Sequence, residues 1–401
     1  MPASSVTSSP LAQLAVMRLA FRPFFLLASL FGIVSLLVWL GFWHGTIVLR
    51  PQGGLVFWHQ HEMLFGFAAA VASGFLLTAV QNWTGLPSLK GGPLLGLVAL
   101  WLAGRVLMAF PSSAASWLVA GVDLLFLPVV ALIMARLVIT AKRWQNLIFL
   151  PVLGLLIAAN VVMHAGLIDG DPLLVRRSAY LAVLLITLLM VVVGGRVIEM
   201  FTANRLGRLR AAPWPALARL TRGSTFAVVL AQALIVLGIP LPNSAQVILL
   251  IIAALANAVS LSRWGGLHSG SEPLLWGLHG SYAFIPLGLA MWALSLLGMF
   301  RTELAVHALT IGAMGTMMLA MMSRVSQGHT GRPVRTLPGI GVALSMMLLA
   351  ALIRSPLLVF FPQITYWTYT LSILLWCLAY GVFLFHYTVP LMSPRIDGKG
   401  G

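Results

Sequence analysis

Charged side chains are scarce in this chain of 401 residues, where Asp, Glu, Lys and Arg together make up only 8%. A soluble domain carries about 25% of them, so the composition excludes an ordinary soluble globular protein. Apolar runs of roughly 18–25 residues recur from residue 23 to residue 390, and each is long enough to cross a bilayer as a helix. Because the runs are continuous rather than alternating, they also exclude a membrane β-barrel.

Cysteine is almost absent as well, since Cys377 is the only one. One thiol forms no internal disulfide, iron–sulfur site or thiolate copper pair, and without a C-x-x-C-H motif haem is not attached through cysteines. Any metal bound by this chain must therefore depend on other side chains, of which imidazole is the most common metal ligand.

The apolar runs predict an all-α, polytopic integral membrane protein with about twelve transmembrane helices. These form one domain, 23–390, between a cytoplasmic N-terminal segment, 1–22, and a cytoplasmic tail, 391–401. The expected spans are 23–43, 62–82, 92–110, 114–138, 147–167, 173–198, 224–240, 244–262, 274–298, 303–323, 337–355 and 364–388. Pro128 and Pro286 fall inside two of them, where we expect kinks.

Positive charge is in excess, with a formal net charge of +16, but its distribution argues against nucleic-acid binding. If the N-terminus is cytoplasmic, 18 of the 24 Lys and Arg residues fall on the cytoplasmic side and the other six outside. The positive-inside rule therefore places both termini in the cytoplasm. The lipid bilayer is then the partner that the basic residues face.

Histidines gather at the outer ends of the predicted spans. Five of the nine share that level, and they come from four spans: His44, His59, His61, His164 and His307. Ionisable groups inside a membrane are rare and usually functional, and imidazole suits copper, iron and zinc, so this layer predicts a metal site. The alternative is that a histidine at a helix end is an interfacial residue with its polar tip in water, which we favour for His44.

The stretch FWHQHEMLFGF, residues 57–67, carries the densest group of candidate ligands. His59 and Glu62 share a helical face, whereas His61 converges with His59 only if residues 57–60 are extended. Glu62 is a candidate catalytic proton relay, because a buried carboxyl can hold a proton near neutral pH. The spacing is not H-E-x-x-H, so a zinc hydrolase is not supported.

Other ionisable residues lie toward the cytoplasmic ends of the spans. His279 falls about one turn into the ninth span, and His329 follows the tenth, with Arg324 and Arg332 beside it. The two arginines are candidate partners for anionic carboxylates beside an axial histidine or, alternatively, contacts for lipid headgroups. His307 and His329 are 22 residues apart, about 33 Å of helix, so we expect two sites, one near each face.

Two further features have structural interpretations. Arg105 and Asp123 flank the hairpin between the third and fourth spans at similar depth, and we expect them to neutralise each other. The methionines of the tenth span recur at helical spacing and are interpreted as core packing, although thioethers also bind Cu(I). Gly312 and Gly315 in that span would let another helix, or a flat macrocycle, approach closely.

Four stretches resemble the NnrS family: FRPFFLLA (21–28), WHQHEMLFGFAAAVASGFLLTAVQNWTG (58–85), LWLAGR (100–105) and HALTIGAMGTMMLAMMSRVSQGHTGRPV (307–334). The resemblance covers essentially the whole chain. It implies a multi-pass protein of the bacterial inner (cytoplasmic) membrane that contains haem b and copper and is linked to nitric oxide metabolism and resistance to nitrosative stress. By motif match it points to His59, His61, His279, His307 and His329, and it leaves open which of them hold haem and which hold copper.

We therefore expect a haem- and copper-containing membrane metalloprotein that binds nitric oxide or reduces it, using an electron donor that the sequence does not identify. His59, His61 and His307 would furnish metal ligands, with Glu62 relaying protons. Two alternatives stay open: a transporter that handles copper or haem, and a haem protein that binds nitric oxide without turnover. Few polar residues at mid-span and no convincing internal repeat argue against the transporter.

Overall fold

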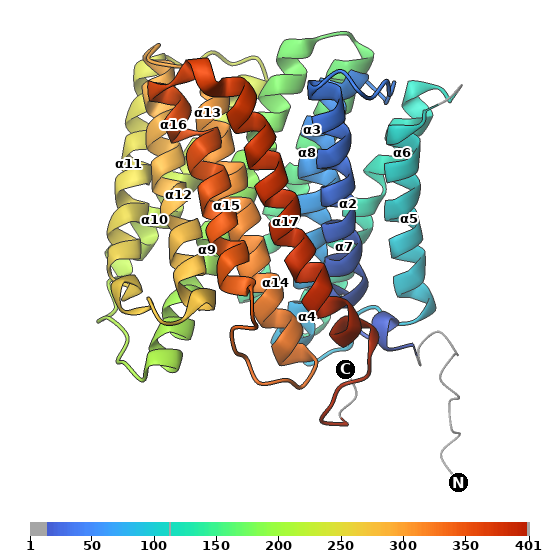
Figure 1. Cartoon of the computed structure of the whole chain (residues 1–401), viewed down its shortest axis with the longest axis vertical. Coiled ribbons are helices and arrows are strands. Elements are labelled where there is room, and N and C mark those ends of the chain that lie inside the picture. Colours follow the sequence, from blue (N-terminus) through green and yellow to red (C-terminus); the bar gives the residue numbers. More distant parts are fainter. Residues whose placement is uncertain (1–13, 112–113, 399–401) are drawn as a thin grey trace.

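The structure of the protein is a computed structural model in which residues 14–111 and 114–398 are described. Twelve helical segments in these ranges are long and apolar enough to span a membrane (Figure 1). This confirms the predicted all-α architecture of about twelve spans. The expected N-terminal segment, 1–22, and tail, 391–401, fall partly on residues 1–13 and 399–401, which lie outside the described ranges.

The first span is α2 (Phe21–Trp43), and the second consists of α3 (Gly54–His61), η2 (Glu62–Ala68) and α4 (Ala69–Thr84). The third is α5 (Gly92–Ala109), and the fourth consists of α6 (Ser116–Leu124) and α7 (Phe126–Thr140). The fifth consists of η3 (Trp144–Asn146) and α8 (Phe149–Ile168), and the sixth is α9 (Pro172–Leu206). The seventh, eighth and ninth spans are α10 (Pro215–Val236), α11 (Asn243–Ser262) and α12 (Pro273–Leu296). The tenth consists of α13 (Thr302–His307), η5 (Ala308–Gly315) and α14 (Thr316–His329). The eleventh consists of α15 (Ile340–Arg354) and α16 (Pro356–Phe360), and the twelfth of η6 (Pro362–Ile364) and α17 (Thr365–Met392). Short turns, η1 (Ala15–Met17) and η4 (Gly266–His268), precede α2 and α12.

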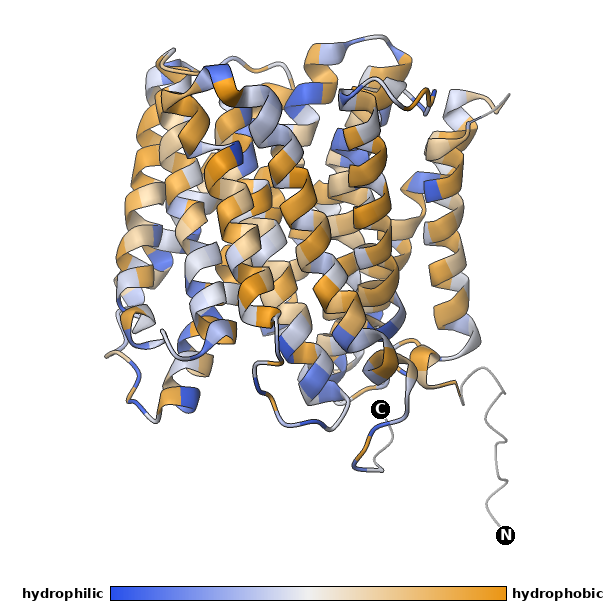
Figure 2. Ribbon diagram, in the orientation of Figure 1, coloured by the Kyte–Doolittle hydropathy of each residue, from blue (hydrophilic) through white to orange (hydrophobic). Residues whose placement is uncertain are grey.

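The outward faces of the bundle are apolar, as expected for helices that meet lipid. Large hydrophobic side chains such as Leu230 of α10 and Leu255 of α11 are exposed, and Figure 2 shows hydrophobic residues along the outer helices. The second span and α9 are the most buried, with 78% and 72% of their apolar stretches inside the protein. α9 packs against α8, α10, α12 and α3, so it lies at the centre of the bundle.

Two spans contain π-helical segments, in which hydrogen bonds run from residue i to i+5 and a turn holds more residues than in an α-helix. η2 begins at Glu62, directly after His61, and η5 begins at Ala308, directly after His307. Because π-helical turns are rare and occur frequently at functional sites, both segments direct attention to these outer histidines.

Pro128 interrupts the fourth span, where a kink was predicted. α6 ends at Leu124 and α7 begins at Phe126, because Pro128 has no N–H for the Leu124 carbonyl and its ring crowds that carbonyl. The interruption directly follows the segment that carries Asp123. Pro286, in contrast, lies inside α12 without ending the helix.

Several spans are longer than the apolar runs predicted, and the second, sixth and tenth show this most clearly. The second begins at Gly54 rather than residue 62, the sixth ends at Leu206 rather than 198, and the tenth ends at His329 rather than 323. Their extra turns contain polar residues and therefore fall outside a continuous apolar run. Residues 57–60 are consequently helical rather than extended, and His59 and His61 face different neighbours.

The start of α2 and the end of α17 lie at the same end of the bundle (Figure 1). We call this the inner end and the opposite one the outer end, following the charge distribution. Two of the loops at the inner end, from α9 to α10 and from α14 to α15, carry Arg208, Arg210, Arg332 and Arg335.

The positive-inside rule predicts that the inner end faces the cytoplasm. In a Cys377→Ser background, Val48→Cys, at a position 90% exposed after α2, should react with a membrane-impermeant maleimide added to right-side-out vesicles. Leu209→Cys, at a position 98% exposed after α9, should react only in inverted vesicles. The opposite labelling pattern would contradict the predicted orientation.

Candidate metal centre

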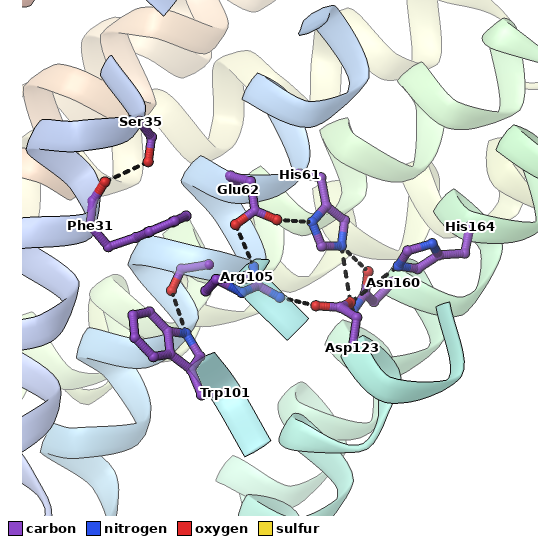
Figure 3. A network of polar contacts seen from close by, with 10 residues as sticks. Phe31, Ser35, His61, Glu62, Trp101, Arg105, Asp123, Asn160 and His164 are labelled. Carbon is purple, nitrogen blue, oxygen red and sulfur yellow. Dashed lines mark hydrogen bonds and ion pairs between the residues drawn. The ribbon is translucent and has the colours of Figure 1, made fainter. Parts of the chain in front are cut away.

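Six polar side chains from four spans meet inside the outer half of the bundle (Figure 3). They are His61 and Glu62 from the second span, Arg105 from α5, Asp123 from α6, and Asn160 and His164 from α8. All six are buried, none more than 5% exposed. Ionisable groups at such depth persist only when they are paired and hydrogen-bonded, and each member of this polar network contacts another member.

The Asp123 carboxylate is the centre of the polar network. Its Oδ2 lies 3.1 Å from His61 Nε2 and 3.1 Å from His164 Nε2. The same oxygen accepts a hydrogen bond from Asn160 Nδ2 at 2.9 Å, and Asn160 Oδ1 lies 3.0 Å from His61 Nε2. One carboxylate group therefore joins α6 to the second span and to α8.

Arg105 bridges the two carboxylates of the network. Its Nη1 donates to Glu62 Oε2 at 2.7 Å, and its Nη2 donates to Asp123 Oδ1. The predicted pairing of Arg105 with Asp123 is thus confirmed. Glu62 Oε1 also lies 3.0 Å from His61 Nδ1, so Glu62 works beside His61 rather than beside His59, which helical spacing had suggested as its neighbour.

The polar network carries a negative charge that its fixed charges do not balance. Glu62 and Asp123 are both paired with the single guanidinium of Arg105, so one negative charge remains when the imidazoles are neutral. In a low-dielectric interior an uncompensated charge is strongly unfavourable. A proton on an imidazole or a bound metal ion would supply the missing positive charge.

The ligand atoms of this network have the separation that a metal ion requires. His61, Asp123 and His164 each offer one atom, and these atoms all lie within 4.8 Å of one another. Two imidazoles and a carboxylate suit copper, zinc and iron. His61 Nδ1 faces Glu62 while its Nε2 faces the centre, which is the arrangement in which a carboxylate orients a metal-binding imidazole.

His59 and His307, two other histidines near the outer end, lie outside this network. The His59 ring stacks on Trp39 with the centroids 4.4 Å apart, and its Nδ1 is buried without a hydrogen-bond partner. His307 Nδ1 donates to the Glu303 carbonyl at 2.6 Å, which leaves Nε2 as the ring's acceptor. Arg354 Nη2 lies 3.2 Å from that Nε2, so a guanidinium engages the nitrogen that a metal would use.

His279 lies in the inner half, on α12. Its Nε2 is 2.9 Å from Thr202 Oγ1 of α9, and its Nδ1 is buried without a hydrogen-bond partner. A Cβ at Gly266 would lie 2.7 Å from that Nδ1, so only a residue without a side chain fits beside this edge of the ring. Arg324 covers the ring of Phe201, the residue before Thr202, at 3.8 Å. His279 and Arg324 therefore meet the same turn of α9.

His329, at the end of α14, has different neighbours. Its ring lies 5.5 Å from that of Phe21, and its carbonyl accepts a hydrogen bond from Arg395 at 3.0 Å. Arg332 has one buried guanidinium nitrogen, Nη1, without a hydrogen-bond partner. The roles predicted for His329 and Arg332 in cofactor binding stay predictions.

The glycines of the tenth span face neighbouring helices rather than open space. A Cβ at Gly312 would clash with Phe284 of α12, and one at Gly315 would lie 2.9 Å from Met347 Cε of α15. Close helix packing therefore explains these two glycines. Met314 and Met317 are buried in the hydrophobic core, in agreement with the packing interpretation of the methionines.

The part that Asp123 and Asn160 play beside the histidines was not predicted from the sequence. Asp123 was expected only to neutralise Arg105, and Asn160 was not singled out. A sequence signal for Asn160 exists, because it lies four residues before His164 and hence on the same face of an otherwise apolar helix. The position of Asp123 beside two histidines depends on contacts between separate spans and has no such local signal.

A family model described as NnrS protein matches residues 15–395. All six residues of the polar network lie within the matched range. No curated protein matches the chain.

Removing the Asp123 carboxylate should strongly destabilise the protein. Asp123→Ala leaves Arg105 and two imidazoles without their shared acceptor, and breaking a buried ion pair costs about 3–5 kcal/mol. The matched control is Asp171→Asn, because exposed Asp171 caps α9 by accepting from Leu173 and Leu174 N–H, and Asn caps nearly as well. Thermal unfolding in detergent measures both, and similar melting temperatures for the two variants would argue against the central role of Asp123.

Proposed function

This chain belongs to the NnrS family, and on that basis we propose that it is a membrane metalloprotein that binds nitric oxide. The observation that carries the proposal is the convergence of His61, Asp123 and His164 within a buried network. We propose further that it acts in nitric oxide metabolism and resistance to nitrosative stress in the bacterial inner membrane. Nitric oxide is small and apolar enough to enter from lipid, so a buried site needs no wide channel.

Copper fits the donor set at the outer network. His61, Asp123 and His164 would hold the ion, and its positive charge would offset the negative charge that Arg105 leaves unbalanced. Glu62 would orient the His61 ring through Nδ1, and Asn160 would fix the Asp123 carboxylate. Bound copper would supply a redox-active, Lewis-acidic centre for nitric oxide.

Haem b fits a different set of residues, in the inner half. A haem iron needs an imidazole nitrogen free of other partners, and His279 Nδ1 is buried, unpartnered and faced by Gly266. Arg324, which meets the same turn of α9, would pair with a propionate. We propose His279 as the axial ligand, in preference to His307, whose Nε2 is engaged by Arg354, and to His59, whose ring is stacked on Trp39.

Reduction of nitric oxide is a second candidate function, favoured by the position of Glu62. The carboxylate lies 3.0 Å from His61 Nδ1 and is fully buried. Because His61 Nδ1 would donate to Glu62 when Nε2 holds a metal, Glu62 would act as the base of this pair, and a proton that it takes up would be available beside the centre. An electron donor of unknown identity would be the remaining partner.

The two sites should lose their metals independently. Protein from cells supplied with copper, iron and a haem precursor should contain both copper and a haem Soret band. His61→Ala and His164→Ala should weaken copper binding by at least about a hundredfold, because even changes behind a direct ligand cost about 10–100-fold. His279→Ala should lose the Soret band and keep copper. His44→Ala, at an exposed position, is the control, and wild-type protein free of both cofactors would overturn the proposal.

A nitric oxide electrode separates binding from turnover. With an artificial reductant under anaerobic conditions, a binder removes nitric oxide only up to its site concentration, whereas a reductase continues. In the second case, with copper supplied to saturation, Glu62→Gln should lower the rate by about 10²–10⁴-fold, the usual contribution of a positioned acid or base. An unchanged rate with Glu62→Gln would exclude this residue as the proton relay.

A further inference from the structure

A cleft opens between α9, α10, α11 and α12 at the inner end. It is remote from the outer network, and its wall includes Tyr282, one turn of α12 from His279. Its volume is about 140 Å³, roughly ten times the space that one water molecule needs. The polar part of its lining includes Arg196, Glu199, Thr221, Arg222, Ser260 and Arg263. The apolar part includes Val191, Val192, Leu217, Trp214 and Trp264. Such a lining suits an amphipathic ligand.

The arginines of the cleft lack acidic partners. Arg196 of α9 and Arg222 of α10 are close enough for their charges to repel each other, and neither forms an ion pair with an acidic side chain in the described part of the chain. Arg263 lies over the Trp214 ring at 5.3 Å and donates to the Ala212 carbonyl at 2.8 Å. These contacts leave its charge uncompensated as well.

The charge of the cleft defines the charge of its ligand. Three arginines and one carboxylate, Glu199, line it, which leaves a net charge of +2. A ligand with two negative charges would therefore match it. Thr221 and Ser260, whose hydroxyl oxygens lie 2.8 Å apart, add hydrogen-bonding groups near the arginines.

The position of the cleft favours a lipid over a free anion. It lies at the inner end of α10 and α11. On the sides of these helices that face away from the bundle, the apolar side chains of Leu220, Phe226 and Val259 are exposed. Exposed Trp214, at the start of α10, is of the residue type that settles at the headgroup level. A free phosphate would use the arginines but would leave the apolar walls without a partner.

We propose that this cleft binds the headgroup of an anionic phospholipid from the inner leaflet, with a preference for the two-phosphate headgroup of cardiolipin over the single phosphate of phosphatidylglycerol. Basic pockets between membrane helices on the cytoplasmic side are suited to such headgroups. Arg196 and Arg222 bind the phosphates, and the acyl chains follow the apolar faces of α10 and α11. None of the three arginines forms a hydrogen bond with His279 or with the outer network, so the proposal does not depend on bound copper or haem.

Titration of cardiolipin onto the purified, delipidated protein, followed by native mass spectrometry, tests the proposal. Arg196→Gln combined with Arg222→Gln should weaken cardiolipin binding about 25-fold, fivefold for each arginine near the membrane surface. The matched control is Arg219→Gln, which removes an exposed arginine of α10 outside the cleft and should change binding less than about twofold. Equal losses in the double variant and the control would overturn the proposal.

Further measurements identify the ligand and the location of its binding site. Ala218→Phe fills the cleft without changing its charge and should also weaken cardiolipin binding, so unchanged binding would contradict the location. Phosphatidylglycerol should bind more weakly than cardiolipin, and inorganic phosphate at millimolar concentration should not compete. Competition by phosphate as effective as by lipid would assign the cleft to a free anion instead. The Soret band and copper content should be the same in all variants, and their loss together with lipid would assign the arginines to a cofactor.

Discussion

A carboxylate buried within a membrane protein must be neutralised, and the packing of the second to fifth spans depends on how Asp123 meets this requirement. Arg105 supplies the charge, and His61, Asn160 and His164 contact the remaining oxygen. Each partner comes from a different span or a different turn. These spans therefore cannot shift relative to one another without leaving a charge unpaired in a low-dielectric interior.

The same constraint links structure to chemistry. Two acidic side chains share one guanidinium, so the network is complete only with an additional positive charge. The local backbone supports this arrangement, because the π-helical segment begins at Glu62 and the interruption of the fourth span follows Asp123. A cation held at this place would thus satisfy the charge of the protein and present a reactive centre within reach of an apolar gas.

α9 connects the outer network with the inner half. With 35 residues, about 52 Å of helix, it extends beyond the bilayer thickness. Near its outer half it packs against α3 and both π-helical segments, and near its inner end Thr202 contacts His279. Arg196 places the same helix at the arginine-lined cleft. One buried helix therefore holds the outer centre, the inner histidine and the cleft in fixed relation.

The sequence by itself determined the twelve spans, because the thickness of the hydrocarbon layer dictates the length of an apolar run. The sequence also determined that several histidines lie near the outer ends of the spans and that Arg105 pairs with Asp123. Only the tertiary structure decided which histidines meet. His59 and His61 are two residues apart, yet regular helix turns them toward different neighbours, so His61 joins His164 and His59 stacks on Trp39. Asp123 and Asn160 likewise become neighbours of His61 only when separate helices pack. Contacts between distant spans depend on side-chain fit around the whole bundle, which no local spacing expresses.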